Sequence, residues 1–284
     1  MDINKLFGSS SSQEGQIQTE QKILSLVSYL NTKPLVYGLE KNLVKHDFQL
    51  QKDVPSVCAR RLLDGEVQLG IVPSIEYARA KVGLKIIPGL SIASKNFVNS
   101  VELFFKRDIK KINTVAVDTS SRTSVALLDI ILREKYEIGP ELIPMAPDLD
   151  TMLKKADAAL IIGDRALHYQ VEYDNKLDLA AEWFDLTGLP FVFAFWAASD
   201  EGIDGTDVQA LQDSYKLGAK NIEQICKDFA VNQPFEWPFY ADYLKNNISY
   251  AFGEDEQEGL MEFYRYAFYY SLIDYIPELN FYDK

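Results

Sequence analysis

The chain has 284 residues, of which 47% are hydrophobic and 25% charged, a composition typical of a globular protein large enough for two α/β units. Its formal net charge of −13 argues against nucleic-acid binding and against attachment to an anionic membrane, because both need a basic surface. The two cysteines, Cys58 and Cys226, are too few for a disulfide framework, so we expect buried free thiols in a reducing compartment.

The first part of the chain is polar and includes a Gly-Ser-rich stretch at 8–12. We expect residues 1–22 to form a disordered extension. They contain no apolar core of the kind that a signal peptide needs, and no apolar run in the chain approaches the roughly 20 residues of a membrane-spanning helix. The sequence therefore predicts a cytoplasmic protein with no membrane partner.

Short apolar runs alternate with helical patterns along the first two thirds of the chain, which is typical of an α/β fold. Strands are expected first at 23–27, 48–51, 67–72, 84–87 and 100–105, with helices at 34–43, 55–63 and 75–79. A second unit has expected strands at 114–117, 142–145 and 158–163 and helices at 123–133 and 148–155. Asp164 is placed to cap the helix that follows. A long apolar strand at 191–198 precedes a mainly helical last third.

This order predicts an α/β protein of two lobes with a ligand cleft between them. The first lobe is expected to comprise 23–105 and 198–284, and the second lobe 106–197, with crossover strands near 101–105 and 192–197. Strands that alternate with helices favour largely parallel sheets covered on both faces. Because ligands bind at the carboxyl ends of strands in such sheets, polar turns at strand ends hold the candidate site residues.

Asn31 and Thr32 occupy the turn after the first expected strand. Pro34 suits the first turn of the helix that follows, so the turn is expected to face the cleft. The Asn31 amide carries both a donor and an acceptor and can orient a hydroxyl or a carboxylate group without a charge. An Asx-type turn that only begins the helix is the alternative interpretation.

Residues 118–124, Asp-Thr-Ser-Ser-Arg-Thr-Ser, run from a strand end into a helix start. The free backbone N–H groups and the positive dipole end of such a helix start favour a carboxylate or phosphate group. The hydroxyls and Arg122 add local donors, which an anionic ligand needs because the net charge of the protein repels it. Alternatively, Thr119 or Ser120 only caps the helix and Arg122 is solvated.

Ser100 begins the strand at 100–105 and its hydroxyl could face the cleft, whereas Ser74 after Pro73 also suits a helix N-cap. Conventional catalytic motifs are missing from the sequence. It has two histidines, no G-x-S-x-G elbow, no phosphate-binding or dinucleotide-binding glycine loop and no zinc-ligand spacing. An enzyme with this sequence is therefore expected to need no cofactor and no metal, and to act through positioning and fixed dipoles.

The polar turns and their flanking residues together resemble the chorismate dehydratases of the futalosine route of menaquinone biosynthesis. The motifs include Ser-Tyr-Leu-Asn-Thr-Lys-Pro-Leu at 28–35 and Ile-Ile-Gly-Asp-Arg-Ala-Leu at 161–167. The others lie at 70–77, 99–104, 118–124, 178–183 and 187–194, so the resemblance covers residues 23–275 in consistent order. Each motif is short, and their combination makes the resemblance specific.

The resemblance implies a type II periplasmic-binding-protein fold and a lyase that removes water from chorismate, a dicarboxylate, to give 3-[(1-carboxyvinyl)oxy]benzoate. Asn31 and Ser100 match the active-site positions of the family. The residues that match substrate-binding positions are Thr32, Ser74, Thr119, Ser120, Ser121, Arg122, Gly163 and Asp164. The resemblance does not explain the N-terminal extension or the acidic balance of the chain.

Two other functions remain open. A cytoplasmic two-lobed receptor for a small molecule would share the fold without catalysing a reaction. The related enzyme that forms 1,4-dihydroxy-6-naphthoate is expected to need a cleft base such as histidine, and neither His46 nor His168 lies in the candidate turns. Binding of chorismate without product formation would identify the receptor, and a side-by-side test of both substrates would distinguish the two enzymes.

Overall fold

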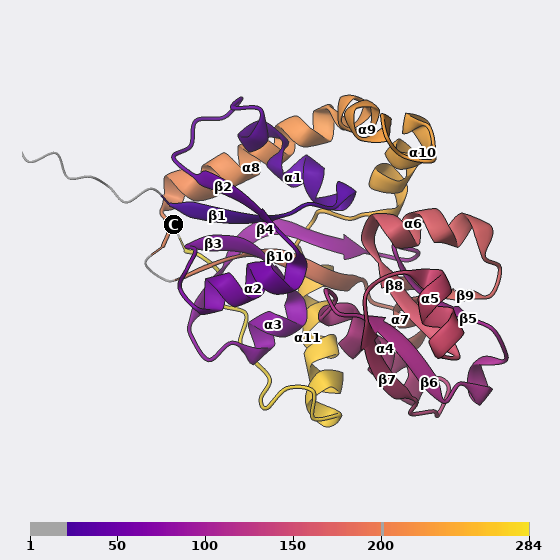
Figure 1. Cartoon of the computed structure of the whole chain (residues 1–284). Helices are drawn as coiled ribbons and strands as arrows, with labels where there is room; N and C mark the ends of the chain where they lie inside the picture. The colour runs from indigo at the N-terminus through magenta and orange to yellow at the C-terminus, as the bar shows by residue number, and fades with distance from the viewer. Residues whose placement is uncertain (1–21, 200–201, 284) are drawn as a thin grey trace, which may run out of the picture.

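Two five-stranded sheets, one in each lobe, organise the described part of the chain (Figure 1). The computed structural model describes residues 22–199 and 202–283. The first sheet has the order β2-β1-β3-β10-β4 and consists of β1 (Ile23–Val27), β2 (Gln49–Asp53), β3 (Leu69–Pro73), β4 (Leu84–Ser94) and β10 (Phe191–Ser199). The second sheet has the order β7-β6-β8-β5-β9 and consists of β5 (Val101–Phe105), β6 (Thr114–Asp118), β7 (Glu141–Met145), β8 (Ala158–Ile162) and β9 (Lys176–Asp178).

Helices cover both sheets, and those of the C-terminal third return to the first lobe. Figure 1 shows α1 and α8 on one side of the first sheet and α2 and α3 on the other. The first lobe contains η2 (Leu30–Thr32), α1 (Lys33–Glu40), α2 (Pro55–Leu63) and α3 (Ser74–Arg79). The second contains η3 (Ile109–Lys111), α4 (Thr123–Glu134), α5 (Leu149–Lys155), α6 (Gly163–Glu172) and α7 (Leu179–Thr187). The remainder comprises α8 (Gly205–Lys220), α9 (Ile222–Ala230), α10 (Trp237–Asp242), the π-helical turn η4 (Tyr243–Asn247) and α11 (Glu254–Tyr269).

The two strands that enter a lobe directly from the other lobe run antiparallel to their neighbours. β10 is antiparallel to β3 and β4, and β5 is antiparallel to β8 and β9, so the prediction of largely parallel sheets is only partly right. The lobes meet at the carboxyl ends of the parallel strands. A strand that arrives from the opposite lobe begins at this junction and must therefore run in the reverse direction.

The predicted lobe boundaries also differ from the sheets by one strand each. β5 was expected in the first lobe, within 23–105, but it lies in the second sheet. β10 was expected mostly in the second lobe, within 106–197, but it lies in the first sheet. The segments that cross between the lobes are thus the short loops before these strands, because the apolar strands themselves are needed inside the sheets.

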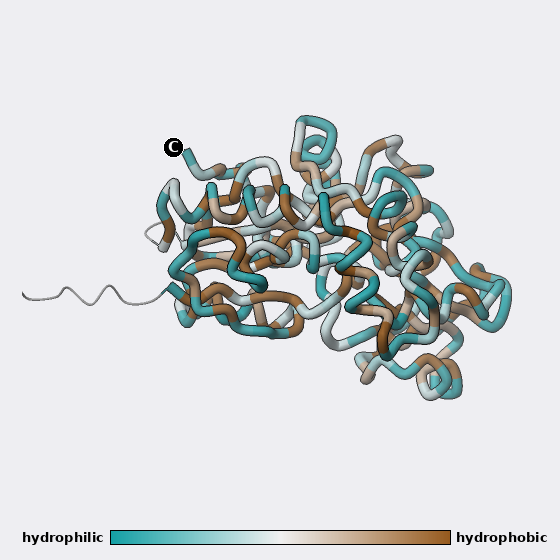
Figure 2. Tube along the Cα trace, turned by 90° about the horizontal axis from the view of Figure 1, so that it is seen from above, coloured by the Kyte–Doolittle hydropathy of each residue, from teal (hydrophilic) through white to brown (hydrophobic). Residues whose placement is uncertain are grey.

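Buried aromatic side chains join α11 to the crossover before β10. The rings of Trp183 and Phe263 pack edge-on against Phe191, with ring centroids 5.5 and 5.0 Å away, and all three side chains are buried. Each such burial contributes about 1.5–3 kcal/mol. A Cβ atom at Gly259 would lie 2.1 Å from the carbonyl oxygen of Pro190, so this close approach of α11 requires glycine. In Figure 2, hydrophobic stretches of the tube occur in both lobes.

The expected disordered extension, residues 1–22, lies outside the described residues except for Lys22. The Lys22 ammonium group pairs with the carboxylates of Asp204 and Asp207, which belong to the N-terminal capping box of α8. Within the described residues, no helix combines the length and the apolar character that crossing a membrane requires.

Candidate active site

A pocket lies between the two lobes, at the carboxyl ends of β1, β3 and β8. It encloses about 620 Å³, part of which is open to solvent. One part of its wall is apolar and includes Ile71, Ile92, Val98 and Phe193. The polar lining residues are Tyr29, Asn31, Thr32, Ser100, Ser121, Arg122, Thr123 and Ser124. An amphiphilic ligand with an apolar ring and polar substituents suits this lining.

Asn31 is held in the pocket wall from two directions. It lies in the 3-10 turn η2, where its backbone oxygen accepts a hydrogen bond from the hydroxyl of buried Tyr250 at 2.8 Å. From the other lobe, the Asp164 carboxylate accepts a hydrogen bond from the backbone N–H of Leu30 at 3.0 Å. These bonds fix the backbone on both sides of the Asn31 amide and leave its side chain at the pocket.

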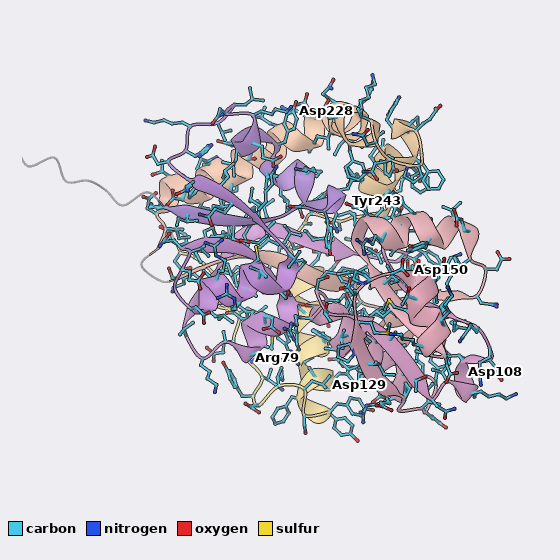
Figure 3. The ribbon with its side chains drawn as sticks, viewed as in Figure 1. Arg79, Asp108, Asp129, Asp150, Asp228 and Tyr243 are labelled. Carbon is cyan, nitrogen blue, oxygen red and sulfur yellow. The ribbon has the colours of Figure 1, made fainter. Side chains whose placement is uncertain are left out.

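Ser100 is 1% exposed and lies directly before β5, at the end of the first crossover loop. Its Oγ atom accepts a hydrogen bond from the hydroxyl of buried Tyr243 at 2.9 Å. Figure 3 shows Tyr243 in the region where the two lobes meet. The Asp178 carboxylate receives the backbone N–H groups of Val98 and Asn99 at 2.8 and 2.6 Å. The loop that carries Ser100 is therefore fastened by a tyrosine and by a carboxylate.

A buried pair of carboxyl groups lies beneath this loop. Asp178 also accepts hydrogen bonds from the N–H groups of Ala180 and Ala181 at the start of α7. Burial raises the pKa of Asp178, and its four N–H donors oppose this rise by favouring the ionised form. Burial, followed by the nearby charge of Asp178, raises the pKa of Glu102 to about 9. Glu102 is thus the protonated partner at neutral pH and Asp178 the ionised one.

The amino end of α4 forms a second polar wall of the pocket. Unlike Asn31 and Ser100, which are hydrogen-bonded to tyrosines, it carries donors that have no partner among the described residues. The Asp118 carboxylate accepts bonds from the N–H and Oγ of Ser120 at 2.8 and 2.7 Å, which folds the turn before the helix. The Oγ atom of Ser121 is buried without a hydrogen-bond partner. Arg122 lines the pocket, and among the described residues it forms no ion pair with a carboxylate. Together with the helix N–H groups, these donors suit an anion.

Six of the ten site residues predicted from the sequence line this pocket: Asn31, Thr32, Ser100, Ser121, Arg122 and Gly163. Gly163 has a φ angle of +67°, and a Cβ there would lie 3.1 Å from the Tyr29 ring, so glycine allows this ring to close one side of the pocket. The other four predicted residues, Ser74, Thr119, Ser120 and Asp164, are not among the residues that line the pocket.

Ser74 and Asp164 instead connect elements around the pocket. The buried hydroxyl of Ser74 donates to the carbonyl oxygen of Val192 at 2.8 Å, which satisfies it within the protein. Asp164 is not the cap of the helix, because α6 begins one residue earlier, at Gly163. Its carboxylate is used for the bond to Leu30, which joins α6 to η2 across the lobes.

Thr119 and Ser120 lie at the outer side of the turn before α4. Thr119 is exposed, and its backbone N–H donates to the carbonyl oxygen of Met145 at 3.3 Å. Ser120 is bound to Asp118 and lies 3.4 Å from the hydroxyl of Tyr29. Thr119 and Ser120 therefore contribute to the shape of the turn. The residues whose donors line the pocket begin directly after them, at Ser121.

Sequence reasoning missed several residues of the site. Tyr29 lies inside the motif at 28–35, and Thr123 and Ser124 lie inside the motif at 118–124, so their position in these motifs is the signal that could have identified them. Tyr243 lies in the π-helical turn η4 and Tyr250 lies between η4 and α11, and in the sequence both resemble ordinary buried core residues. No local pattern indicates that their hydroxyls reach Ser100 and Asn31.

Burial changes the protonation of side chains near the pocket. It raises the pKa of Asp164 to about 6 and raises the pKa of the Tyr29 phenol above its ordinary value. It lowers the pKa of His168, whose Nε2 lies 3.0 Å from the hydroxyl of Tyr240. Neither His46 nor His168 lines the pocket. In the described ranges, no cluster of three or more His, Cys, Asp or Glu side chains is arranged to hold a metal ion.

The sequence matches a family model described as menaquinone biosynthesis over residues 24–269. A chorismate dehydratase from Thermus thermophilus is 32% identical over 259 residues, which covers 85% of this chain and 93% of that protein. A chorismate dehydratase from Campylobacter jejuni is 28% identical over 246 residues, which covers 85% of this chain and 95% of that protein.

Solved structures confirm the predicted fold class, a periplasmic-binding-protein-like fold of two α/β lobes. A protein from Archaeoglobus fulgidus has a TM-score of 0.76 at 16% identity and covers 90% of this chain and 100% of its own. The periplasmic aliphatic sulphonate binding protein of Escherichia coli has a TM-score of 0.64 at 16% identity and covers 92% of both chains. The structural likeness establishes the fold, and the family model and sequence relatives establish the family: the chain belongs to the menaquinone biosynthesis family, among whose members are the chorismate dehydratases.

Proposed function

We propose that the chain converts chorismate to 3-[(1-carboxyvinyl)oxy]benzoate and water, in menaquinone biosynthesis by the futalosine route. The observation that carries this proposal is the joint presence in one pocket of Asn31, Ser100 and the unpartnered donors of Ser121 and Arg122. Chorismate is a small ring that carries two carboxylates and a hydroxyl group. An apolar pocket with a free anion-binding wall is complementary to such a molecule.

The reaction removes a proton from C3 and the hydroxyl group from C4 of the ring. The electron pair of the C3–H bond becomes a ring π bond, and the C4–O bond breaks with its pair on oxygen. The proton completes the departing water, so no oxidant or reductant is consumed. Because the product ring is aromatic, the driving force is large, and the protein has mainly to fix geometry and stabilise charge.

In the proposed mechanism, the amino end of α4 holds one carboxylate through Ser121, Arg122 and the helix N–H groups. Asn31 orients the enolpyruvyl side chain or the hydroxyl group, and Ser100 supports the hydroxyl group as it leaves. No Asp, Glu or His belongs to the described pocket lining. This composition supports the hypothesis that the enolpyruvyl carboxylate of the substrate itself accepts the C3 proton.

We further propose that the reaction requires no cofactor or metal and takes place in the cytoplasm. An elimination that produces an aromatic ring involves no net redox change, which removes the need for a redox cofactor. The two cysteines are free and buried, and buried free thiols suit a reducing compartment.

The test is an incubation of the purified protein with chorismate, with and without EDTA, followed by ultraviolet absorbance and mass spectrometry. We expect an aromatic product that is lighter by one water, at the same rate with and without EDTA. Heat-denatured protein provides the control for spontaneous decay of chorismate.

The other outcomes assign the protein differently. Binding of chorismate without product would indicate a two-lobed receptor, and turnover only of the cyclic precursor of 1,4-dihydroxy-6-naphthoate would indicate the related enzyme. Loss of turnover in EDTA, restored by a divalent cation, would overturn the metal-independent mechanism while leaving the dehydratase assignment intact.

A further inference from the structure

The Ser100 hydroxyl is one end of a hydrogen-bonded chain that begins in the C-terminal helices. Tyr243 comes from the π-helical turn η4 and lies 143 residues further along the sequence, yet its hydroxyl is 2.9 Å from the Oγ atom of Ser100. The Tyr243 side chain is buried, and Figure 3 shows it between the lobes. A buried phenol in contact with a pocket residue must have a defined direction of hydrogen bonding.

The direction follows from the groups around the phenol. Burial raises the pKa of Tyr243 well above its ordinary value, so the phenol keeps its proton at neutral pH. The contributions of the Ser100 and Asn31 side chains lower this pKa, but burial is the larger effect. The hydrogen-bond geometry has the Tyr243 hydroxyl as donor and the Ser100 Oγ atom as acceptor, at 2.9 Å.

The proton of Ser100 is therefore free to point elsewhere. Its Oγ atom is already an acceptor of the Tyr243 proton, and within the described residues no protein atom accepts the Ser100 proton. Ser100 lines the pocket, so its O–H group is left to donate into it. We infer that Tyr243 is a positioning residue that fixes Ser100 as a hydrogen-bond donor to the leaving hydroxyl group of the substrate.

This inference rests on the proposed dehydration and specifies one step of it. As the C4–O bond breaks, negative charge develops on the departing oxygen, and a hydrogen bond from Ser100 stabilises that charge. Ser100 keeps its own proton, because the proton that completes the water comes from C3. A chain of aligned hydrogen bonds strengthens the final donor, since each bond polarises the next.

Two other buried tyrosines provide the comparison. The hydroxyl of Tyr250 donates to the carbonyl oxygen of Asn31 at 2.8 Å, and that of Tyr264 donates to the carbonyl oxygen of Ser74 at 2.7 Å. A carbonyl oxygen has no proton to direct, so these bonds hold the backbone only. Tyr264 is as buried as Tyr243, but its hydroxyl binds the backbone oxygen of Ser74, which does not line the pocket, so Tyr264→Phe is a matched control.

The test measures steady-state turnover of chorismate by Y243F, Y264F, S100A and the double variant S100A/Y243F. We expect Y243F to lower kcat about 10- to 100-fold with KM within about threefold, since the lost group acts on charge that develops only in the transition state. In the S100A background, Y243F should change kcat less than about twofold, because the Ser100 hydroxyl through which Tyr243 acts on the substrate is already removed. Y264F should lower Tm about as much as Y243F and keep kcat within about twofold.

Three results would overturn the inference. These are a normal kcat in Y243F, a loss in Y243F that persists undiminished in S100A, or an equal loss of kcat in Y264F. Absence of turnover by the unmodified protein would overturn the dehydratase proposal itself and the inference with it. Normal turnover by the unmodified protein and by Y243F would overturn the role of Tyr243 alone.

Discussion

The two polar walls of the pocket differ in whether their groups have partners before a ligand arrives. On one wall, the Oγ atom of Ser100 receives Tyr243 and the backbone of Asn31 receives Tyr250. On the other, at the amino end of α4, the hydroxyl of Ser121 is buried without a partner and Arg122 has no carboxylate beside it in the described chain. The groups of the first wall are held in place by contacts within the protein, whereas the second wall presents donors that have no protein partner among the described residues.

This difference separates two tasks that a pocket must perform. Groups that stabilise a transition state act best when they are fixed in advance, because no reorganisation is then needed during the reaction. For donors that recognise a charged ligand, the free-energy cost of desolvation is offset only when the ligand binds and accepts their hydrogen bonds. We call the wall with Asn31 and Ser100 the fastened wall, and the wall with Ser121 and Arg122 the open wall. We therefore expect substitutions in the fastened wall to reduce kcat and substitutions in the open wall to raise KM.

The largest effect is expected from the fastened wall. Replacement of Asn31 or Ser100 by Ala should lower kcat about 100- to 1,000-fold, because each variant removes one prepared donor, while Tm stays within a few degrees. The matched control is Ser91→Ala, which also truncates a buried serine, one that donates to the carbonyl oxygen of Ala251 outside the pocket. Steady-state kinetics that give near-normal kcat for both site variants would remove them from the mechanism.

The open wall should respond with a different kinetic signature. Arg122→Ala removes a charge-assisted bond worth about 1.5–3 kcal/mol, so KM should rise about 10- to 100-fold with a smaller change in kcat. Arg60→Ala removes the same charge from an exposed ion pair with Glu66 and should leave KM unchanged. An equal KM for R122A and the unmodified protein would show that α4 does not bind the substrate.

Much of this arrangement can be predicted from the sequence because it is local. The run at 23–27 is the first strand β1, and the expected helix at 55–63 matches α2 residue for residue. Apolar runs bounded by turn residues determine such elements, and the polar turns at their ends place Asn31 and Arg122 at the pocket.

The parts that sequence analysis did not predict depend on contacts between distant segments. Whether β5 belongs to the first or the second sheet depends on its partners β8 and β9, and its own apolar composition suits either lobe. The same holds for Asp164, whose residue type suits a helix cap but whose carboxylate binds Leu30 in the other lobe. Long-range partners are not encoded in spacing along the chain.

A smaller effect is expected from the carboxyl pair that supports the Ser100 loop, and it should appear in stability. The pKa of Glu102 is raised to about 9, so between the ordinary carboxyl pKa and that value the folded protein holds a proton that the unfolded chain has lost. Stability should therefore fall as pH rises through this range. Glu102→Gln mimics the protonated form, which is the form that can hydrogen-bond to Asp178.

E102Q should consequently be more stable than the unmodified protein, by about 1–3 kcal/mol at pH 8 and by less at pH 5. Urea denaturation at both values of pH measures the difference. A variant that is destabilised equally at pH 5 and pH 8 would show that Glu102 contributes through packing and not through its proton.

The smallest effect is expected at Asp164, which ties the fastened wall to the second lobe. Burial raises its pKa to about 6, so its ionisation reduces stability only as pH rises from near 4 to about 6. An asparagine oxygen can still accept the N–H of Leu30, so Asp164→Asn should keep kcat within about threefold and stabilise the protein by about 1–2 kcal/mol above pH 6. The shape of the pH dependence separates the two carboxyls: the advantage of D164N should level off above pH 6, whereas that of E102Q should keep growing towards pH 9. If the D164N advantage also grew above pH 7, the pH dependence would have to be assigned to a titrating group other than Asp164.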